Sequence, residues 1–253
     1  MAATTGEESS SRKTWQPGSG KMRPMRILAL ETSTDLGSCA LWQDGEVMEI
    51  RCPTGRPHSE TLLPLARGLL AEASLGFSQL DAIAFGAGPG AFTGLRVACA
   101  VAQGLAVAAD LPVVPVGTLE ALAFEGGGDR VLALLDARMG EVYYATLIRA
   151  GDELQRQGLL RVVPPDEVVL PAEPGWLACG NALAAYPGLA GRVAAAGLEA
   201  RPGIMPTAAA VARLAAPRLQ RGEGEDPAAA APLYVRDKVA QTVAERLAGG
   251  GKA

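Results

Sequence analysis

Residues Asp81–Val116 read DAIAFGAGPGAFTGLRVACAVAQGLAVAADLPVVPV. The apolar run Asp81–Phe85 predicts a strand, and the glycine-rich Gly86–Thr93 predicts a turn. Gly94–Ala109 predicts a helix, and Val113–Val116 predicts a second buried strand. Strand, turn, helix and strand in this order indicate a crossover unit and a partly parallel sheet.

The residues before this unit predict three further strands. Arg26–Leu30 is a short apolar run, and the polar turn Glu31–Gly37 follows it. Ser38–Trp42 and Val47–Arg51 alternate as strands do, and Gln43–Glu46 joins them. The Asp-Gly pair inside that junction is a strong hairpin signal.

A similar opening recurs downstream. Val131–Leu135 and Glu141–Ile148 predict a second strand–turn–strand, and Leu177–Cys179 predicts a short strand. Pro206–Leu219 predicts an alanine-rich helix. Two such openings, each followed by crossover elements, predict a duplicated α/β architecture of the ribonuclease H-like kind, which is the layout of actin-like (ASKHA) ATPases.

The expected organisation is a tail and two subdomains. Residues 1–24 are polar and are expected to form a disordered tail. The three consecutive glycines in Glu125–Asp129 mark a candidate boundary. We expect a first subdomain over 25–124 and a smaller second one over 125–253, whose C-terminal helix packs back on the first.

Composition limits the classes of function. The 253 residues carry a formal net charge of -4, with 49% hydrophobic and 20% charged residues, which predicts a globular protein. The acidic balance argues against a protein that holds nucleic acid alone. Four dispersed cysteines and a single histidine, His58, predict reduced thiols, no zinc site and no metal. With no secretory signal and no unbroken apolar span, we expect a cytoplasmic protein that does not enter a membrane.

Three turns carry polar groups or glycines that could face a phosphate. The glycine-rich turn is neither a Walker A loop nor a dinucleotide fingerprint, because the spacing differs from both. Taken alone, each turn is at least as well explained as an ordinary structural connection. The candidate phosphate-facing residues are Thr32, Ser33, Thr34, Gly88, Gly90, Asp136 and Arg138.

Two helices are apolar over more than one face. Ser59 can cap a helix running to about Ser74, whose apolar stripe is broad. In Gly94–Ala109 only Arg96 and Gln103 are polar, and both lie on one side. The alternatives are a central core helix and a surface shared with another chain. The candidate interface residues are Leu62, Leu63, Ala66, Leu70, Arg96, Val97, Ala100, Gln103 and Gly104.

Several strings together resemble one family. ILALETSTDLGSCAL (Ile27–Leu41), AFGAGPGAFTGLRVA (Ala84–Ala98) and LLDARMGEVYYA (Leu134–Ala145) are similar to the TsaB/YeaZ family. The similarity is firm from Arg26 to Ala145 and looser through Gly180-Asn181 and Leu233–Arg236. The family is the degenerate sister of the subunit that transfers a threonylcarbamoyl group to adenosine next to the anticodon in tRNA.

The resemblance implies a non-catalytic partner, or dimerization, subunit with no catalytic residues. Thr118 and Leu122 stand where the catalytic sister carries metal-binding histidines, and Asp136-Ala137-Arg138 replaces a Gly-Gly phosphate loop. It implies no cofactor, although weak or shared ATP/ADP binding stays open. The implied partners are the catalytic sister (TsaD-like), a small ATPase (TsaE-like) and a second copy, with tRNA bound only through the complex. The two apolar helices are the implied docking elements.

Two other classes stay open. A phosphotransferase of the actin-like, sugar-kinase class would need a catalytic aspartate, and Asp35 and Asp136 are the candidates. A glycoprotease-like peptidase would need a metal or a nucleophile. The metal requirement is not met with one histidine, and no Gly-x-Ser-x-Gly nucleophile elbow is present.

Overall fold

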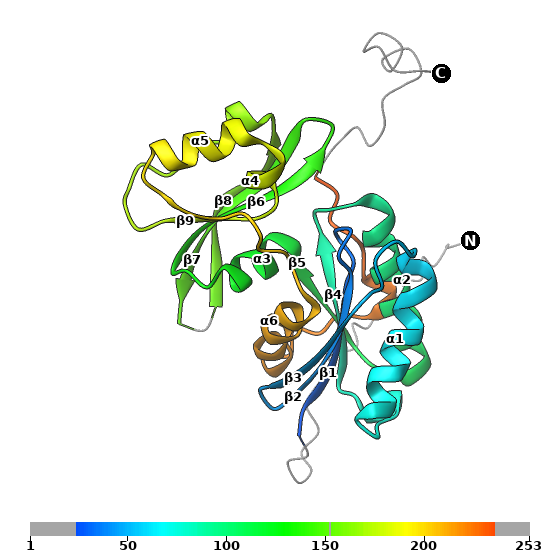
Figure 1. Cartoon of the computed structure of the whole chain (residues 1–253). Coiled ribbons are helices and arrows are strands. Elements are labelled where there is room, and N and C mark those ends of the chain that lie inside the picture. Colours follow the sequence, from blue (N-terminus) through cyan, green and yellow to red (C-terminus); the bar gives the residue numbers. More distant parts are fainter. Residues whose placement is uncertain (1–23, 152, 236–253) are drawn as a thin grey trace, which may run out of the picture.

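The computed structural model describes residues 24–151 and 153–235, which form two α/β halves (Figure 1). Each half is built on a five-stranded sheet. The strands of the first sheet are β1 (Arg26–Glu31), β2 (Ser38–Gln43), β3 (Glu46–Arg51), β4 (Ala82–Gly88) and β5 (Val113–Gly117). Those of the second are β6 (Arg130–Arg138), β7 (Glu141–Ala150), β8 (Glu153–Val163), β9 (Leu177–Cys179) and β10 (Glu199–Arg201).

The two sheets have the same topology. Their orders are β3-β2-β1-β4-β5 and β8-β7-β6-β9-β10, the second read from its β8 edge. In each sheet the first three strands pair antiparallel, and the fourth and fifth strands join in parallel. The predicted duplication and the partly parallel sheet are therefore confirmed.

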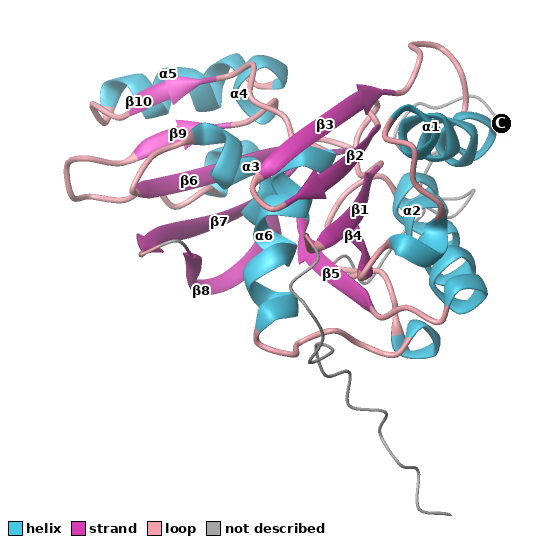
Figure 2. Ribbon diagram, turned by 90° about the horizontal axis from the view of Figure 1, so that it is seen from below, coloured by secondary structure: helices cyan, strands magenta, loops and turns pink. Residues whose placement is uncertain are grey.

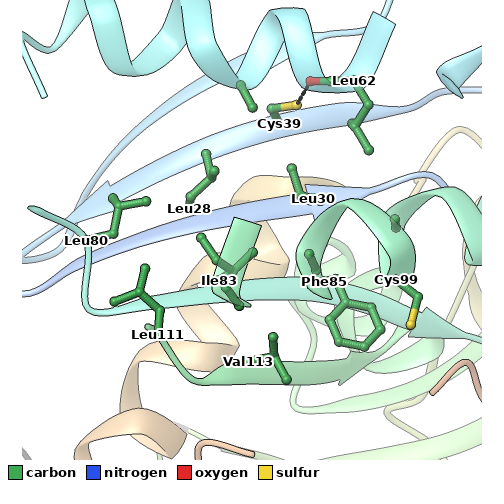
Figure 3. Packing of buried hydrophobic residues seen from close by; sticks show 14 of the residues in the cluster. Leu28, Leu30, Cys39, Leu62, Leu80, Ile83, Phe85, Cys99, Leu111 and Val113 are labelled. Atoms are coloured by element: carbon green, nitrogen blue, oxygen red, sulfur yellow. Dashed lines mark hydrogen bonds between the residues drawn. The ribbon is translucent and has the colours of Figure 1, made fainter. Parts of the chain in front are cut away.

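Helices cover both faces of the first sheet. The helices α1 (His58–Glu72) and α2 (Phe92–Ala109) pack on one face, around Leu28, Leu30, Ile83 and Phe85 (Figure 3). The helix α6 (Ala208–Gln220) packs on the other face, against Ile27, Ala29 and neighbouring alanines. Short 3₁₀ turns occur at Phe77–Gln79, Pro165–Glu167 and Pro227–Ala229.

The second sheet is also covered on both faces. The helix α3 (Thr118–Gly126) packs on one face, and α4 (Ala182–Ala185) and α5 (Pro187–Ala195) pack on the other. The helix α3 also contacts α6, so these two helices lie between the sheets (Figure 2). This middle layer brings the turns of the two halves together.

All the predicted strands are present, but β4 and β6 run three residues beyond their predicted ends, and β8 and β10 were not predicted. Some helix boundaries were also wrong. Asp44 and Gly45 have positive φ values of 47° and 97°, as the predicted hairpin requires. The helix α1 begins at His58, with Pro57 as a cap that makes no side-chain hydrogen bond, so Ser59 is not its cap. The helix α2 begins at Phe92 and so includes the end of the predicted turn.

The change from the first sheet to the second falls at the glycine triplet. The helix α3 ends at Gly126, Gly127 adopts a left-handed conformation as its C-cap, and β6 begins at Arg130. After the second sheet, α6 and the segment 225–233 return to the first. The tail expected over 1–24 lies outside the described residues except for Pro24.

Candidate functional site

The turns after β1, β4 and β6 meet at one cavity of about 250 Å³ between the halves. Five of the seven predicted phosphate-facing residues line it, namely Ser33, Thr34, Gly90, Asp136 and Arg138. The duplicated topology explains the meeting, because equivalent turns of the two sheets face one another. Further lining residues were not predicted to face a phosphate, although the family resemblance continues through Asn181 and Leu233–Val235. They include Phe92, Tyr143, Asn181, Met205 and Leu233–Val235.

Two predicted residues do not line this cavity. Thr32 is fully buried, and its Oγ1 donates a hydrogen bond to the carbonyl oxygen of Gly94 at 2.7 Å. Gly88 has φ of 117°, and a Cβ there would lie 2.8 Å from the carbonyl oxygen of Leu233. Thr32 therefore packs against the chain itself, and Gly88 lines a second cavity instead.

A buried carboxyl group lies beneath the first turn. Glu31 is fully buried, and its Oε1 accepts a hydrogen bond from the backbone N–H of Ser33 at 2.5 Å. Its Oε2 has no partner among the described residues and faces Gly86, where a Cβ would lie only 1.9 Å away. Burial raises the pKa of Glu31, and the hydrogen bonds from Ser33 only partly offset this effect. Because the Ser33 N–H donates to Glu31, it does not point to a ligand in the cavity.

The charged groups around the cavity are paired with one another. The Arg138 Nη2 lies 2.5 Å from the Asp35 Oδ2, so this ion pair joins the β1–β2 turn to the β6–β7 turn. The Asp136 Oδ1 accepts hydrogen bonds from the Tyr186 hydroxyl at 2.7 Å and from the Arg138 N–H at 2.9 Å. Asn181 Oδ1 accepts the Asp136 backbone N–H at 2.8 Å. These bonds leave few donors aimed at a phosphate.

The predicted interface residues divide by burial. Leu62, Ala66 and Leu70 are buried in the core beneath α1, so the prediction that they contact a partner was wrong in this structure. The stripe that marked them is the face that α1 packs on the sheet. Leu63, Val97 and Gln103 are half-buried, whereas Arg96, Ala100 and Gly104 are exposed.

The helix α2 also exposes a residue that the sequence did not single out. Val107 is 69% exposed and lies seven residues after Ala100, on the same side of the helix. The i, i+4, i+7 spacing of Ala100, Gly104 and Val107 was available in the sequence as a signal. By length and composition α2 could also cross a membrane, but Leu95, Ala98, Ala102 and Ala106 bury one face of it on the sheet.

The metal-ligand positions implied by the resemblance are part of the core. Thr118 and Leu122 are fully buried on α3, and the Thr118 Oγ1 has no hydrogen-bond partner among the described residues. Within residues 24–151 and 153–235, no three His, Cys, Asp or Glu side chains are grouped to hold a metal ion. The His58 Nε2 lies 3.0 Å from the carbonyl oxygen of Thr34, which is consistent with a structural role.

All four cysteines are free thiols, and three of them are buried. Burial raises the pKa of Cys39 and Cys99, and it raises that of Cys179 to about 12. Burial also raises the pKa of the half-buried Cys52. A nucleophilic thiol needs a lowered pKa, so none of these groups has the properties of a catalytic cysteine.

Comparisons with known proteins agree with the resemblance. A family model described as "TsaD: tRNA N6-adenosine threonylcarbamoyltransferase" matches residues 53–178. The Escherichia coli (strain K12) tRNA threonylcarbamoyladenosine biosynthesis protein TsaB is 36% identical over 231 residues, which cover 85% of this chain and 96% of that protein. The TsaB protein of Haemophilus influenzae is 46% identical over 132 residues, covering 51% of this chain and 56% of that protein.

Solved structures show the same relationship. A crystal structure described as an uncharacterized protein with similarity to peptidase YEAZ, from Pseudomonas aeruginosa, has a TM-score of 0.75 and 38% identity. The match covers 84% of this chain and all of that one. A second structure, YeaZ from Pseudomonas aeruginosa, has a TM-score of 0.74 and 36% identity, covering 83% of this chain and 99% of that one. This chain belongs to the TsaB/YeaZ family.

Proposed function

We propose that this chain is the non-catalytic partner subunit of the complex that transfers a threonylcarbamoyl group to adenosine in tRNA. It supports a catalytic sister of the TsaD type and works with a small ATPase of the TsaE type. A second copy of the chain uses the same surface when the sister is absent. The tRNA is held through the complex, the subunit acts in the cytoplasm, and its fold is that of a degenerate actin-like ATPase.

The exposed face of α2 is the observation that carries this proposal. One side of α2 is packed on the sheet, and Arg96 and Gln103 bond to the chain's own C-terminal segment. The remaining side presents Ala100, Gly104 and Val107 to solvent. Small residues let another helix approach closely. The side chains on this face bury little apolar surface within the chain, so this surface remains exposed.

The cavity between the halves supports a role without catalysis. In a phosphate-binding turn, N–H groups and cations must be free to meet the ligand. Here the Ser33 N–H is bonded to Glu31, and Arg138 is paired with Asp35. The subunit accordingly needs no metal and no nucleotide of its own, and any ATP or ADP binding is weak or shared with the sister.

The two other classes fit these contacts less well. A phosphotransferase needs an unpaired carboxylate base, whereas Asp35 pairs with Arg138 and Asp136 accepts bonds from Tyr186 and Arg138. A peptidase is suggested by the name of one solved relative. It would need a metal or an activated nucleophile, and the described residues group no metal ligands and hold thiols of raised pKa.

Association with the sister subunit tests the proposal. The chain is co-expressed with the TsaD-like protein of its own organism, and complex formation is measured by gel filtration and calorimetry. We expect Ala100→Glu to weaken association at least tenfold, because the interface would bury an unpaired carboxylate. The variant itself stays folded by circular dichroism, since Ala100 is exposed.

Leu159→Glu is the matched control. Leu159 is 74% exposed on β8 at the edge of the second sheet, whereas α2 covers the first sheet, so the same new charge leaves association unchanged. Threonylcarbamoylation of tRNA is then reconstituted with each variant, the sister and the small ATPase. If Ala100→Glu bound the sister as tightly as the wild type does, α2 would not be part of the interface. Activity of this chain alone on tRNA would overturn the non-catalytic role.

A further inference from the structure

The segment after α6 runs back along α2. Val113 and Glu225 exchange backbone hydrogen bonds of 3.0 and 2.8 Å, which fix its beginning to the edge of the first sheet. Gln103 Nε2 then donates to the carbonyl oxygens of Pro227 and Ala230 at 3.0 and 3.1 Å. The polar stripe of α2 therefore holds the chain's own C-terminal segment, which Figure 1 shows passing α2 toward the boundary between the halves.

The last described residues, Leu233–Val235, cross between the halves, and we call them the strap. The Leu233 N–H donates to the carbonyl oxygen of Ala87 at 2.7 Å, at the end of β4. Val235 packs against the core of the second half. Leu233 lines both the 250 Å³ cavity and a second cavity of about 180 Å³. The strap therefore separates two cavities that both halves line.

The two ends of this segment differ in burial. Ala230 is buried and is bonded to Gln103, whereas Leu233 and Tyr234 are 44% and 47% exposed. Tyr234 is held through its hydroxyl, which accepts a hydrogen bond from the Arg96 Nε at 3.0 Å. The Arg96 guanidinium lies 3.8 Å from the centre of the Phe92 ring, and the Phe92 and Tyr234 ring centres are 5.5 Å apart.

We call the contacts among Arg96, Phe92 and Tyr234 the latch, because they hold the strap at the surface and not in the core. Half-exposed groups with few backbone hydrogen bonds open at low free-energy cost, while the buried anchor near Ala230 stays in place. Arg96 is one helical turn from Ala100, so it borders the exposed face of α2. A carboxylate of a protein docked on that face can pair with Arg96 and so withdraw the donor from Tyr234.

We propose that the strap can leave its position between the two halves, and that Arg96 couples this release to the docking of a partner on α2. When Arg96 turns to a partner carboxylate, Tyr234 loses its hydrogen bond and Leu233 leaves Ala87. The two cavities then become one continuous cleft between the halves. The identity of the partner rests on the proposed function, whereas the latch itself is a property of this chain.

Hydrogen exchange at the Leu233 amide tests the latch on the isolated chain. That N–H is bonded to Ala87 only while the strap is closed. We expect Arg96→Gln to speed its exchange about tenfold or more, and Tyr234→Phe to speed it less, because the ring contact remains. Arg67→Gln is the matched control, since it removes an exposed arginine from α1 without touching the strap. Unchanged exchange in Arg96→Gln would overturn the latch.

Adding the TsaD-like sister tests the link to docking. Faster exchange of the Leu233 amide in the complex supports the proposal, while amides of β1 serve as the internal reference for global stability. If the sister binds and the Leu233 amide exchanges at the same rate or more slowly, the link is wrong and the proposed function stands. If the sister does not bind, the proposed function is wrong, and the Arg96→Gln result on the isolated chain still decides the latch.

Discussion

Glu31 buries a carboxyl group directly beneath the turn between β1 and β2. Its Oε1 accepts the Ser33 N–H, and its Oε2 is enclosed against Gly86 without a partner among the described residues. An ionised carboxylate in that position has lost its hydrogen bonds to water, and hydrogen bonds within the protein replace only some of them. The raised pKa of Glu31 follows from this loss, and it makes the turn a point where stability depends on pH.

Glu31→Gln should change that pH dependence. Because the folded-state pKa is raised, the stability contributed by protonation is complete below the unfolded value near 4.5 and is lost as pH rises through the folded value. Glutamine cannot ionise, so the free energy of unfolding of the variant does not fall in this way as pH rises. We expect the variant to be more stable than the wild type at neutral pH and to lose this advantage below the unfolded pKa.

Urea unfolding of both proteins from pH 4 to pH 8 measures the effect. Other titrating groups cancel in the difference between the two curves. A difference that stays constant over this range would mean that Glu31 is equally ionised in the folded and unfolded states. In that case burial would not raise the pKa of Glu31.

At the scale of elements, α2 serves three surfaces at once. It packs on the first sheet, it binds the segment 225–235 through Arg96 and Gln103, and it exposes Ala100, Gly104 and Val107. Its two glycines have opposite surroundings. A Cβ on Gly94 would lie 1.8 Å from the carbonyl oxygen of Thr32, while a Cβ on Gly104 would meet nothing within 4 Å.

Gly94→Ala and Gly104→Ala therefore form a matched pair on one helix. Alanine is favoured over glycine in a helix interior by about 1 kcal/mol, so Gly104→Ala should stabilise the protein by roughly that amount. Gly94→Ala should destabilise it by several kcal/mol, because the clash is with backbone and displaces the β1–β2 turn. Thermal and urea unfolding measure both changes. Equal effects of the two variants would show that helix propensity dominates at both positions.

The helix α2 also shows which structural features could be predicted from the sequence. The apolar, small-residue pattern correctly predicted that α2 packs in the core, but it overstated the burial, because one side of the helix stays exposed. The Arg96–Gln103 spacing placed both residues on one face. The pattern could not reveal that this face binds residues 225–235, because that contact joins positions more than 100 residues apart. For α1, periodicity identified the buried stripe but could not distinguish a chain's own core from a partner, so Leu62 was misplaced.

The elements that were missed have short or weakly patterned sequences. The strand β8 carries Arg156, Gly158 and Arg161 and shows little alternation, so only its pairing with β7 defines it. The helix α3 begins at Thr118 directly after β5, without a turn between them. The predicted phosphate-facing turns did converge on one cavity, but their sequence could not show that internal hydrogen bonds occupy their donors. Those bonds depend on Glu31 and Asp35 in the folded chain.

At the scale of the whole molecule, the halves are joined by contacts of unequal burial. The Arg138–Asp35 pair joins the two turns directly, but its side chains are 69% and 80% exposed. Arg218 on α6 lies deeper, where its Nη1 donates to the carbonyl oxygen of Pro115 at 3.0 Å. Its Nη2 donates to the Glu120 Oε2 on α3 at 2.5 Å, and both of these side chains are about a quarter exposed.

These two arginines give the final prediction. Arg218→Met keeps much of the side-chain stem but leaves Glu120 and the Pro115 carbonyl without their donor, so it should lower the free energy of unfolding by about 1.5–3 kcal/mol. Arg138→Met removes an exposed pair and should cost less than about 1 kcal/mol, an effect that weakens further as salt is added. Urea unfolding at low and high salt measures both. If Arg138→Met proved as costly as Arg218→Met, the surface pair would be holding the halves together, and the α3–α6 layer would not be the principal joint.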